Sequence, residues 1–398
     1  MVRQKQGSPI IKLLISDDSA FMRIAIRKMV EGNPDIQVVG EAKTGQMCVE
    51  MCEQLRPDVI TMDVEMPVMD GLEATRQIMA RTPTPIIMLS SLTERNSVTT
   101  IKALELGAVD FIAKKSSFVQ LDIVKIGEEL VEKLQFWAKK KARLALINRG
   151  AGSASLGDQP NGQTPYRPAT GAGFNGHHGA PIDPSIPVAM RKVDAQPNPG
   201  LVVLGISTGG PATLPQTLKA MGRLACPMIV AQHMPPMFTS GFALHLRSET
   251  GLDVVESTDG MQLKPGMVVI IKGGTDAVVR EPFPGKMMLY ERTQPDAPIH
   301  PNADVLFRSA ASVSGNLVAV VMTGMGSDGM QGAKDLVQRK GCAVLAQEPS
   351  SCIVDGMPSS VINAGLASAV LNPHDLGVRL ARLAGQAPSS VKIPSFFA

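Results

Sequence analysis

Short apolar runs alternate with longer amphipathic segments in the first part of the chain, along residues 11–113. The apolar runs are IKLLIS, IQVVGE, DVITM, PIIMLS and VDFIA. Each run is followed by a segment whose apolar residues recur with helical spacing, at 22–30, 44–55, 71–79, 98–106 and from about 118 onward. Five strand–helix units of this kind predict a parallel sheet that is covered by helices on both faces.

Residues 150–200 differ from this pattern. They are rich in Gly, Pro, Ser and Ala and lack any periodicity, as in SASLGDQPNGQTPYRPATGAGFNG, which predicts a flexible linker. Strand-like runs then resume as LVVLGI, PMIVAQ, VVIIKG, NLVAVVM and CAVLA. Amphipathic segments accompany them near residues 211–221, 240–249, 303–313 and 334–340.

The chain therefore divides into three parts. We expect a first domain at residues 9–130, a helix and linker at 131–198, and a second domain at 199–388. The expected fold class is α/β, with two doubly wound parallel-sheet domains, the first flavodoxin-like and the second Rossmann-like.

Composition narrows the classes of function. The 39 basic and 36 acidic residues give a net charge of +3, which argues against a nucleic-acid partner. Five cysteines without a CxxC pair predict buried, reduced thiols rather than disulfides or a zinc ribbon, as is typical of a cytoplasmic protein. No apolar run approaches the ~18 to 20 residues that span a bilayer, so we expect no membrane insertion.

Acidic residues follow two predicted strands of the first domain. Asp17 and Asp18 come after the first strand and Asp63 after the third. Because the carboxyl ends of parallel strands meet at one edge of the sheet, the three carboxylates are expected to share a crevice and to bind Mg²⁺. Ser90 ends the fourth strand, and Lys114, after the fifth, offers an ammonium group for a phosphoryl oxygen. The alternative for each acidic residue alone is a helix cap or a turn.

With these residues in place, the first domain resembles a response-regulator receiver domain. The resemblance rests on the Asp17-Asp18 pair, on Asp63 in TMDVEMPVMDG, and on Ser90 in MLSSLT together with Phe111 and Lys114. It implies that a histidine kinase phosphorylates Asp63 and that Asp17, Asp18, Asp63 and the carbonyl of Glu65 surround Mg²⁺. It also implies that Ser90 and Lys114 bind the phosphoryl group and that Phe111 is a switching aromatic residue. Lys115 stands where the family usually has proline.

The second domain offers a nucleophile in LVVLGISTGG. Ser207 lies where an apolar strand ends and a Gly-rich turn leads into a helix, and the segment fits G-x-S-x-G. Small neighbours allow a tight turn that projects the hydroxyl, and the helix amino terminus supplies N–H groups for an oxyanion. The alternative is that Ser207 only caps the helix.

A serine nucleophile needs a base and an orienting acid. Among six histidines, His233 ends the strand that follows the Ser207 strand, and His300 is a secondary candidate. Asp328 follows the strand NLVAVVM, so the three side chains can meet at one sheet edge. The order Ser, His, Asp differs from that of the α/β-hydrolases.

Other chemistries fit this domain less well. Gly324, Gly326 and Gly329 satisfy the dinucleotide pattern G-x-G-x-x-G, but Asp328 would then repel the pyrophosphate. The turn at Ser207 lacks the lysine of an ATP-binding P-loop, and the histidines lack the spacing of a metal hydrolase. A transcriptional output would require a basic helix, which is missing, whereas a catalytically inactive docking module is not excluded by charge.

With the triad assembled, the second domain resembles the catalytic domain of the CheB family of protein-glutamate methylesterases. The matching segments are GISTGGPATL, AQHMPPMFTSGFALHL, HPNADVLFRSAA, VVMTGMGSDGMQGA and EPSSCIVDGMP. The resemblance implies catalysis by Ser207, His233 and Asp328 with the Met325 amide as an oxyanion donor, and no cofactor in this domain. It further implies a phosphorylation-regulated hydrolase that demethylates glutamate methyl esters and deamidates glutamines on chemotaxis receptors during sensory adaptation. Asp355 stands where an aromatic or apolar residue is common.

The two domains together suggest how such an activity is regulated. We expect the unphosphorylated receiver to cover the active-site face and phosphorylation of Asp63 to favour an open form.

Overall fold

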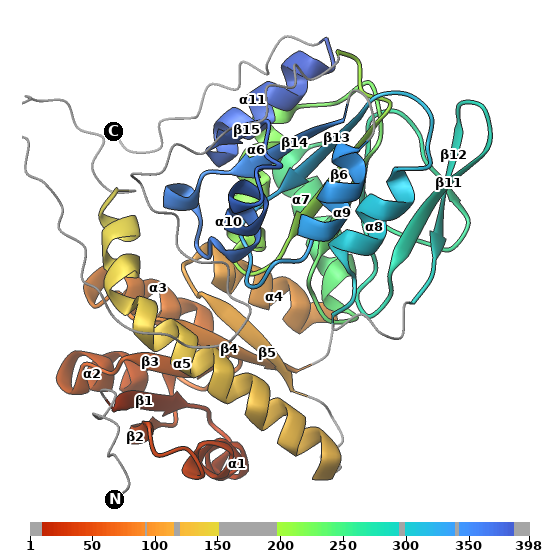
Figure 1. Cartoon of the computed structure of the whole chain (residues 1–398). Coiled ribbons are helices and arrows are strands. Elements are labelled where there is room, and N and C mark those ends of the chain that lie inside the picture. The colour runs from red at the N-terminus through yellow and green to blue at the C-terminus, as the bar shows by residue number, and fades with distance from the viewer. Residues whose placement is uncertain are drawn as a thin grey trace, which may run out of the picture.

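The computed structural model describes residues 10–91, 94–114, 120–150, 197–293, 299–338 and 342–385 and contains two α/β domains (Figure 1). The linker predicted at residues 150–200 falls mostly outside the described residues, and so does Lys115. No helix in these ranges is long and apolar enough to cross a membrane.

The first domain is built on a five-stranded parallel sheet with the order β2-β1-β3-β4-β5. The strands are β1 (Ile11–Ser16), β2 (Ile36–Ala42), β3 (Val59–Asp63), β4 (Ile86–Ser91) and β5 (Asp110–Lys114). The helices are α1 (Ala20–Glu31), α2 (Gly45–Leu55), α3 (Gly71–Arg81), α4 (Glu94–Glu105) and α5 (Gln120–Gly150). All five predicted strand–helix units are confirmed.

Both faces of this sheet are buried, as its apolar strands require. Leu13 and Ile15 point to the face covered by α1 and α5, where Trp137 is buried, whereas Leu14 points to the opposite face. This division follows from the two-residue period of a strand. Asp17 and Asp18 follow β1 and Asp63 ends β3, so the acidic side chains lie at the carboxyl edge of this sheet.

The second domain contains a seven-stranded parallel sheet with the order β15-β14-β13-β6-β7-β10-β8. Its strands are β6 (Leu201–Ile206), β7 (Met228–Gln232), β8 (Asp253–Glu256), β10 (Met267–Ile270), β13 (Leu317–Val321), β14 (Ala343–Gln347) and β15 (Ala369–Leu371). The chain moves outward from β6 to β7 on one side and returns to β13 on the other side. The carboxyl end of β6 is consequently the switch point at which a ligand crevice is expected in such a sheet.

The helices of the second domain cover both faces of this sheet (Figure 1). They are α6 (Gly210–Met221), α7 (Phe238–Thr250), α8 (Ala303–Ala310), α9 (Met330–Val337), α10 (Gly356–Asn363), α11 (Pro373–Leu383) and the short η1 (Pro349–Ser351). The predicted doubly wound fold is confirmed, although α10, α11 and the edge strands β8 and β15 were not foreseen.

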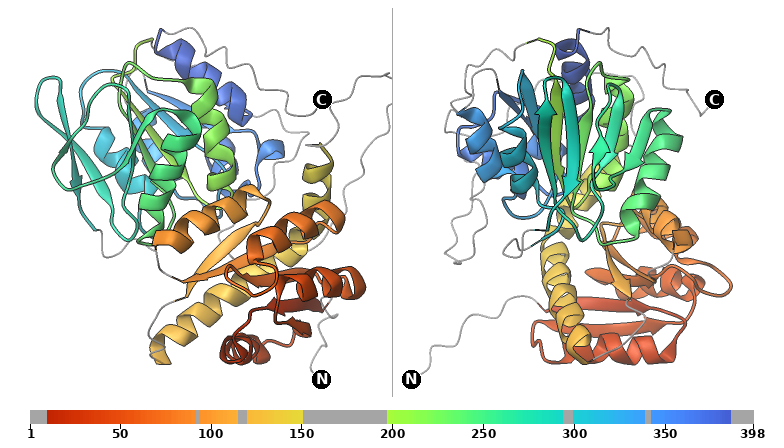
Figure 2. Two further views of the ribbon diagram at one scale, coloured as in Figure 1. Left: turned by 180° about the vertical axis from the view of Figure 1, so that it is seen from behind. Right: turned by 90° about the vertical axis from the view of Figure 1, so that its right-hand side faces the viewer.

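A three-stranded antiparallel sheet is added to this domain and was also not foreseen. Its order is β11-β12-β9, with β9 (Met261–Gln262), β11 (Ala277–Phe283) and β12 (Lys286–Glu291). Figure 1 and the left-hand view of Figure 2 show its long hairpin extending from the side of the domain. One face of the hairpin is buried through Val279 and Leu289, and the other is partly exposed.

The receiver-like domain packs against the second domain through α4 and α5 (Figures 1 and 2). Glu105 at the end of α4 bonds to the ring of His245 on α7, at 2.6 Å. Lys140 on α5 forms an ion pair with Asp355 at 3.3 Å, so the unusual acidic residue at this position has a partner in the other domain. The ring of Phe111 lies 4.7 Å from that of Phe238, centroid to centroid.

Candidate active site

Ser207 lies directly after β6, at the switch point of the seven-stranded sheet. Its N–H donates to the carbonyl of Thr323 (2.9 Å), and its own carbonyl accepts from Gly210 N–H (2.9 Å), which closes the turn into α6. Gly209 has φ +85°, and a Cβ on Gly210 would lie 2.1 Å from Gln232 Oε1. Both positions therefore require glycine, and the strand–turn–helix context of the motif is present.

His233 is brought beside Ser207 by strand register. Ile206 of β6 pairs with Gln232 of β7, so the next residue on each strand leaves the sheet at the same edge. The N–H of His233 donates to the carbonyl of Ile206 at 3.0 Å. In the described part of the chain, the Ser207 hydroxyl makes no hydrogen bond to the His233 ring. A catalytic hydrogen bond of this kind often forms only when substrate binds.

Asp328 completes the cluster. One carboxylate oxygen lies 2.7 Å from His233 Nε2, and the same oxygen accepts from Ala303 N–H at 2.6 Å. The other oxygen accepts from Asp304 N–H and from Gly329 N–H, each at 2.9 Å. The carboxylate thus lies at the amino terminus of α8, where two backbone donors and the helix dipole stabilise negative charge.

The surroundings of Asp328 keep it ionised. Burial alone would raise the pKa of Asp328, but the hydrogen bond and the charge interaction with His233 lower it, and the Ala303 and Asp304 N–H groups lower it further. The net pKa lies below the usual value. An ionised carboxylate on Nε2 leaves Nδ1 of His233 as the nitrogen that can take a proton.

Met325 lies in the loop between β13 and α9, next to the Ser207 turn. A Cβ on the preceding Gly324 would lie 2.7 Å from Ser207 Cβ, which shows how closely this loop approaches the serine. The Met325 side chain packs with Ile353 against a buried cluster that contains Trp137 of α5. Its role as an oxyanion donor remains a prediction.

The other histidines lie in different environments. His300 Nδ1 lies 2.9 Å from Asp276 Oδ2, and Asp276 Oδ1 accepts from Asn302 N–H at 2.8 Å. Because Asn302 caps α8, the secondary candidate supports the helix that holds Asp328 rather than the serine. His245 lies at the domain interface.

Gln232 is a site residue that sequence reasoning missed. It is buried, and its Nε2 donates to the carbonyls of Ser207 (3.0 Å) and His233 (3.1 Å). One amide group thus bridges the backbones of the predicted nucleophile and base. The available signal was a polar residue at the end of the apolar run PMIVAQ.

A second cluster lies at the carboxyl edge of the receiver-like sheet. Oxygen atoms of Asp17, Asp18 and Asp63 lie within 4.8 Å of one another. Lys114 Nζ contacts Asp17 Oδ2 at 2.9 Å and Asp63 Oδ1 at 2.8 Å. Burial raises the pKa of Asp63, and the charge of Lys114 offsets this only in part. Three hard oxygen donors at this spacing fit Mg²⁺.

The remaining receiver residues lie around this cluster. Ser90 is buried near the end of β4, opposite Ala113, which precedes Lys114 on β5. Phe111 lies on the same strand with its ring against Phe238. Glu65 follows Asp63 by two residues, its side chain is exposed, and the proposed use of its carbonyl remains a prediction.

Comparisons with known proteins follow the division into two domains. Residues 202–380 match the family described as CheB methylesterase, and residues 13–124 match the response regulator receiver domain. A protein-glutamate methylesterase/protein-glutamine glutaminase 1 of Saccharophagus degradans is 38% identical over 348 residues, which are 86% of this chain and 90% of the relative. A protein-glutamate methylesterase/protein-glutamine glutaminase of Halalkalibacterium halodurans is 36% identical over 347 residues, 86% of this chain and 89% of the relative.

Two solved structures from Thermotoga maritima are similar to the separate domains. The CheB methylesterase catalytic domain is 35% identical, with a TM-score of 0.45, and the match covers 47% of this chain and 99% of that one. The response regulator domain of CheB is 46% identical, with a TM-score of 0.31, and the match covers 33% of this chain and 97% of that one. The identity to full-length relatives over most of their length shows that the chain belongs to the CheB methylesterase family of hydrolases, with a response-regulator receiver domain ahead of the methylesterase domain.

Proposed function

We propose that this chain is a phosphorylation-regulated protein-glutamate methylesterase and protein-glutamine glutaminase that acts on chemotaxis receptors. The relatives carry these activities in their names. The observation that carries the proposal is the hydrogen bond of 2.7 Å between His233 and Asp328, beside the strand end that bears Ser207. A buried His–carboxylate pair next to a serine in a tight turn is the arrangement of a serine hydrolase.

The reaction proceeds by acyl transfer. Ser207 Oγ attacks the side-chain carbonyl of a glutamate methyl ester, and His233 accepts the hydroxyl proton. His233 returns this proton to the leaving group, which departs as methanol from an ester or as ammonia from a glutamine amide. Water then attacks the acyl-enzyme, with His233 again as the base, and releases a glutamate carboxylate.

Asp328 and the backbone support both steps. The carboxylate fixes the orientation of the His233 ring and stabilises the imidazolium that forms when the ring accepts a proton. The amide of Met325 donates to the oxyanion, on a loop that touches Ser207 through Gly324. Gln232 keeps the backbones of Ser207 and His233 at a fixed separation.

The receiver controls this site through phosphorylation. A histidine kinase is the proposed donor, and Asp63 the acceptor. Asp17, Asp18, Asp63 and the Glu65 carbonyl would hold Mg²⁺, which would supply positive charge for the incoming phosphoryl group. Lys114 already contacts Asp63, and Ser90 lies at the adjacent strand end, so both are placed to bind phosphoryl oxygens.

The domain contact suggests how the signal reaches the catalytic residues. Phe111 precedes Lys114 by three residues on β5, and its ring packs on Phe238, five residues after His233. Ile353, which packs against the buried cluster around Trp137, lies 2.7 Å from the position of a Cβ on Gly209. Residues of α5 therefore pack against the segment at Ile353, which in turn contacts the turn that carries the nucleophile. A change at Asp63 that moves Phe111 weakens the packing between the two domains.

The test is methanol release from receptor-containing membranes with labelled glutamyl methyl esters. Wild type is expected to release methanol, and more of it with a small phosphodonor and Mg²⁺. Ser207→Ala should lose several orders of magnitude in rate, whereas Ser240→Ala, in the same domain on α7, should keep the wild-type rate. Near-normal turnover by Ser207→Ala would refute the assignment of Ser207 as the nucleophile. Methanol release that is the same with and without phosphodonor would refute regulation by phosphorylation.

A further inference from the structure

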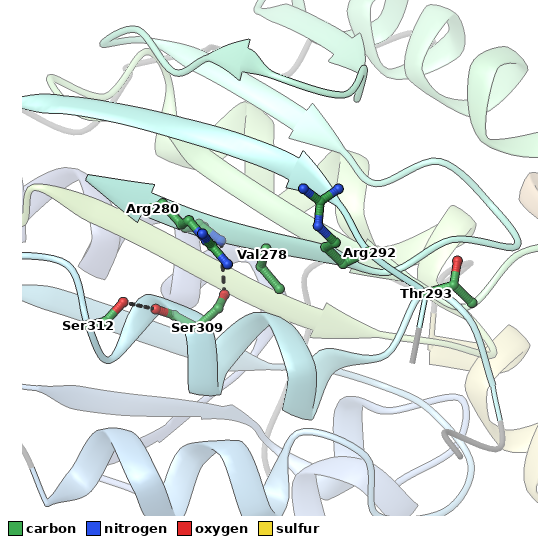
Figure 3. A pocket seen from close by; sticks show the side chains of 7 residues that line it. Val278, Arg280, Arg292, Thr293, Ser309 and Ser312 are labelled. Atoms are coloured by element: carbon green, nitrogen blue, oxygen red, sulfur yellow. Dashed lines mark hydrogen bonds between the residues drawn. The ribbon is translucent and has the colours of Figure 1, made fainter. Parts of the chain in front are cut away.

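A groove lies on the antiparallel hairpin, apart from Ser207 and His233. It has a volume of about 540 Å³ and lies between β11 and residues 292–293, which follow β12, on one side and the carboxyl-terminal part of α8 on the other. Figure 3 shows Arg280, Val278 and Arg292 in sequence along the hairpin, with Ser309 and Ser312 beside Arg280. Two cationic side chains thus line a groove that has no role in the reaction proposed above.

The arginines keep most of their hydrogen-bond donors available. Arg280 is exposed and has no ion-pair partner among the described residues. Arg292 is also exposed, donates from one nitrogen to the carbonyl of Glu291 (2.6 Å), and lies 3.8 Å from the exposed carboxylate of Asp259. Its guanidinium also lies over the ring of Tyr290, 5.8 Å from the centroid. A guanidinium has five N–H donors, so each arginine retains enough to bind a carboxylate.

The hydroxyl groups of the two serines in the groove donate their protons to backbone carbonyls. Ser309 Oγ donates to the carbonyl of Leu306 (2.8 Å) and accepts from Val279 N–H (3.0 Å). Ser312 Oγ donates to the carbonyl of Ser309 at 2.7 Å. The cationic donors of the groove are therefore the two arginines, which favours an anionic ligand.

The groove runs along the helix that holds the orienting acid. Ala303 N–H binds Asp328, and Ser309 follows six residues later, roughly 9 Å along the helix axis. At the other end, Arg292 N–H donates to the carbonyl of Asp276, which in turn holds the cap of α8. A ligand in the groove is consequently about two helical turns from the catalytic cluster.

We propose that this groove binds glutamate carboxylates of the substrate segment while a neighbouring ester or amide of the same segment occupies the active site. The inference rests on the proposed function, because each turnover converts a neutral side chain into a carboxylate. Arg280 lies opposite Met288, and Arg292 follows the end of β12, four residues after Met288. The two arginines are therefore roughly 14 Å apart along the hairpin. On a helical substrate this spacing matches carboxylates about nine residues apart.

The test uses two synthetic helical peptides that each carry one glutamyl methyl ester. One has two glutamates about nine residues apart, the nearer of them about two helical turns from the ester, and the other has alanines at those positions. Full-length protein with phosphodonor and Mg²⁺ is assayed for methanol release, and peptide binding is followed separately by fluorescence anisotropy. Wild type should prefer the acidic peptide about tenfold or more, through KM rather than kcat, and salt should reduce the preference.

Three variants locate the effect. Arg280→Gln and Arg292→Gln should each reduce the preference about fivefold, as expected for a partly exposed ion pair, and leave turnover of the alanine peptide unchanged. Lys286→Gln removes an exposed cation on the same hairpin that does not line the groove and should have no effect. Equal loss in Lys286→Gln, or a preference retained by both arginine variants, would overturn the proposal.

The two proposals fail in different ways. If wild type binds the acidic peptide through the arginines but releases no methanol from either peptide, the esterase assignment fails and the groove stands. If wild type hydrolyses both peptides with equal KM, the esterase stands and the groove is not a substrate site.

Discussion

Replacing Asp328 by asparagine tests the arrangement of the catalytic cluster. The carboxylate accepts four hydrogen bonds, two at each oxygen. An amide nitrogen in place of Oδ1 would face two backbone N–H donors, from Asp304 and Gly329. An amide nitrogen in place of Oδ2 would face one backbone N–H donor, from Ala303, and the His233 ring, which can accept a hydrogen bond. We therefore expect the asparagine side chain to place its nitrogen at the Oδ2 position.

That orientation reverses the tautomer of His233. The amide N–H would donate to Nε2, so the ring proton would move to Nδ1 and leave no base toward Ser207. A reversed tautomer in a serine triad costs about 10⁴-fold in kcat, which corresponds to roughly 5.5 kcal/mol in the activation barrier. The unsatisfied Ala303 N–H should also lower the free energy of unfolding by about 1 to 3 kcal/mol.

The assay combines methanol release with thermal unfolding. Asp304→Asn is the matched control, since Asp304 lies on the same helix and an asparagine can still accept from Gly332 N–H, which now donates at 2.6 Å. We expect the control to keep kcat within a few-fold of wild type. If Asp328→Asn kept kcat within about tenfold of wild type, the tautomer argument would be wrong.

Acid titration gives an independent check on Asp328. Its folded pKa is lowered, so its ionised form stabilises the fold above the unfolded pKa of about 3.9, and this contribution is lost as pH falls through the folded value. Asp328→Asn should therefore remove part of the acid-induced loss of stability in wild type, measured by denaturant unfolding between neutral and acidic pH. An unchanged dependence of stability on pH would mean that other carboxylates, not Asp328, cause the loss of stability in acid.

Three further predictions concern the switch and the positioning of the catalytic residues. Mg²⁺ at a concentration one hundred times its Kd should stabilise wild type by about 2.7 kcal/mol, measured as a rise in Tm. Asp63→Asn should lose most of this rise in Tm, and phosphodonor should no longer stimulate its methanol release. Lys140→Glu places like charges at the Asp355 contact and should raise methanol release without phosphodonor about fivefold, whereas the exposed neighbour variant Lys139→Glu should not. Gln232→Leu should lower kcat by up to about 100-fold at unchanged KM, and wild-type kcat would show that the bridging amide is dispensable.

The main elements of the fold follow from local patterns. The runs IKLLIS and LVVLGI form β1 and β6 with the bounds that the sequence predicts, because a continuous apolar run is stable only when both strand faces are buried. The hairpin β11–β12 escaped prediction because AVVREPF mixes buried and exposed residues and contains a proline. Short edge strands such as β15 are stabilised by their neighbours rather than by their own sequence.

The apolar pattern of the chain is enough to identify the residues at the strand ends, which are the serine, the histidine and the acids. The apolar pattern is a local property of the chain, and it shows where each strand ends. Because the strands are parallel, their carboxyl ends lie at the same edge of the sheet. Three contacts depend instead on how the chain packs in three dimensions: Asp328 contacts Nε2 of His233, α8 supplies two N–H groups to the Asp328 carboxylate, and Gln232 joins the two strand ends. These contacts join segments up to 95 residues apart, and their geometry depends on strand register and loop packing, which no local pattern encodes.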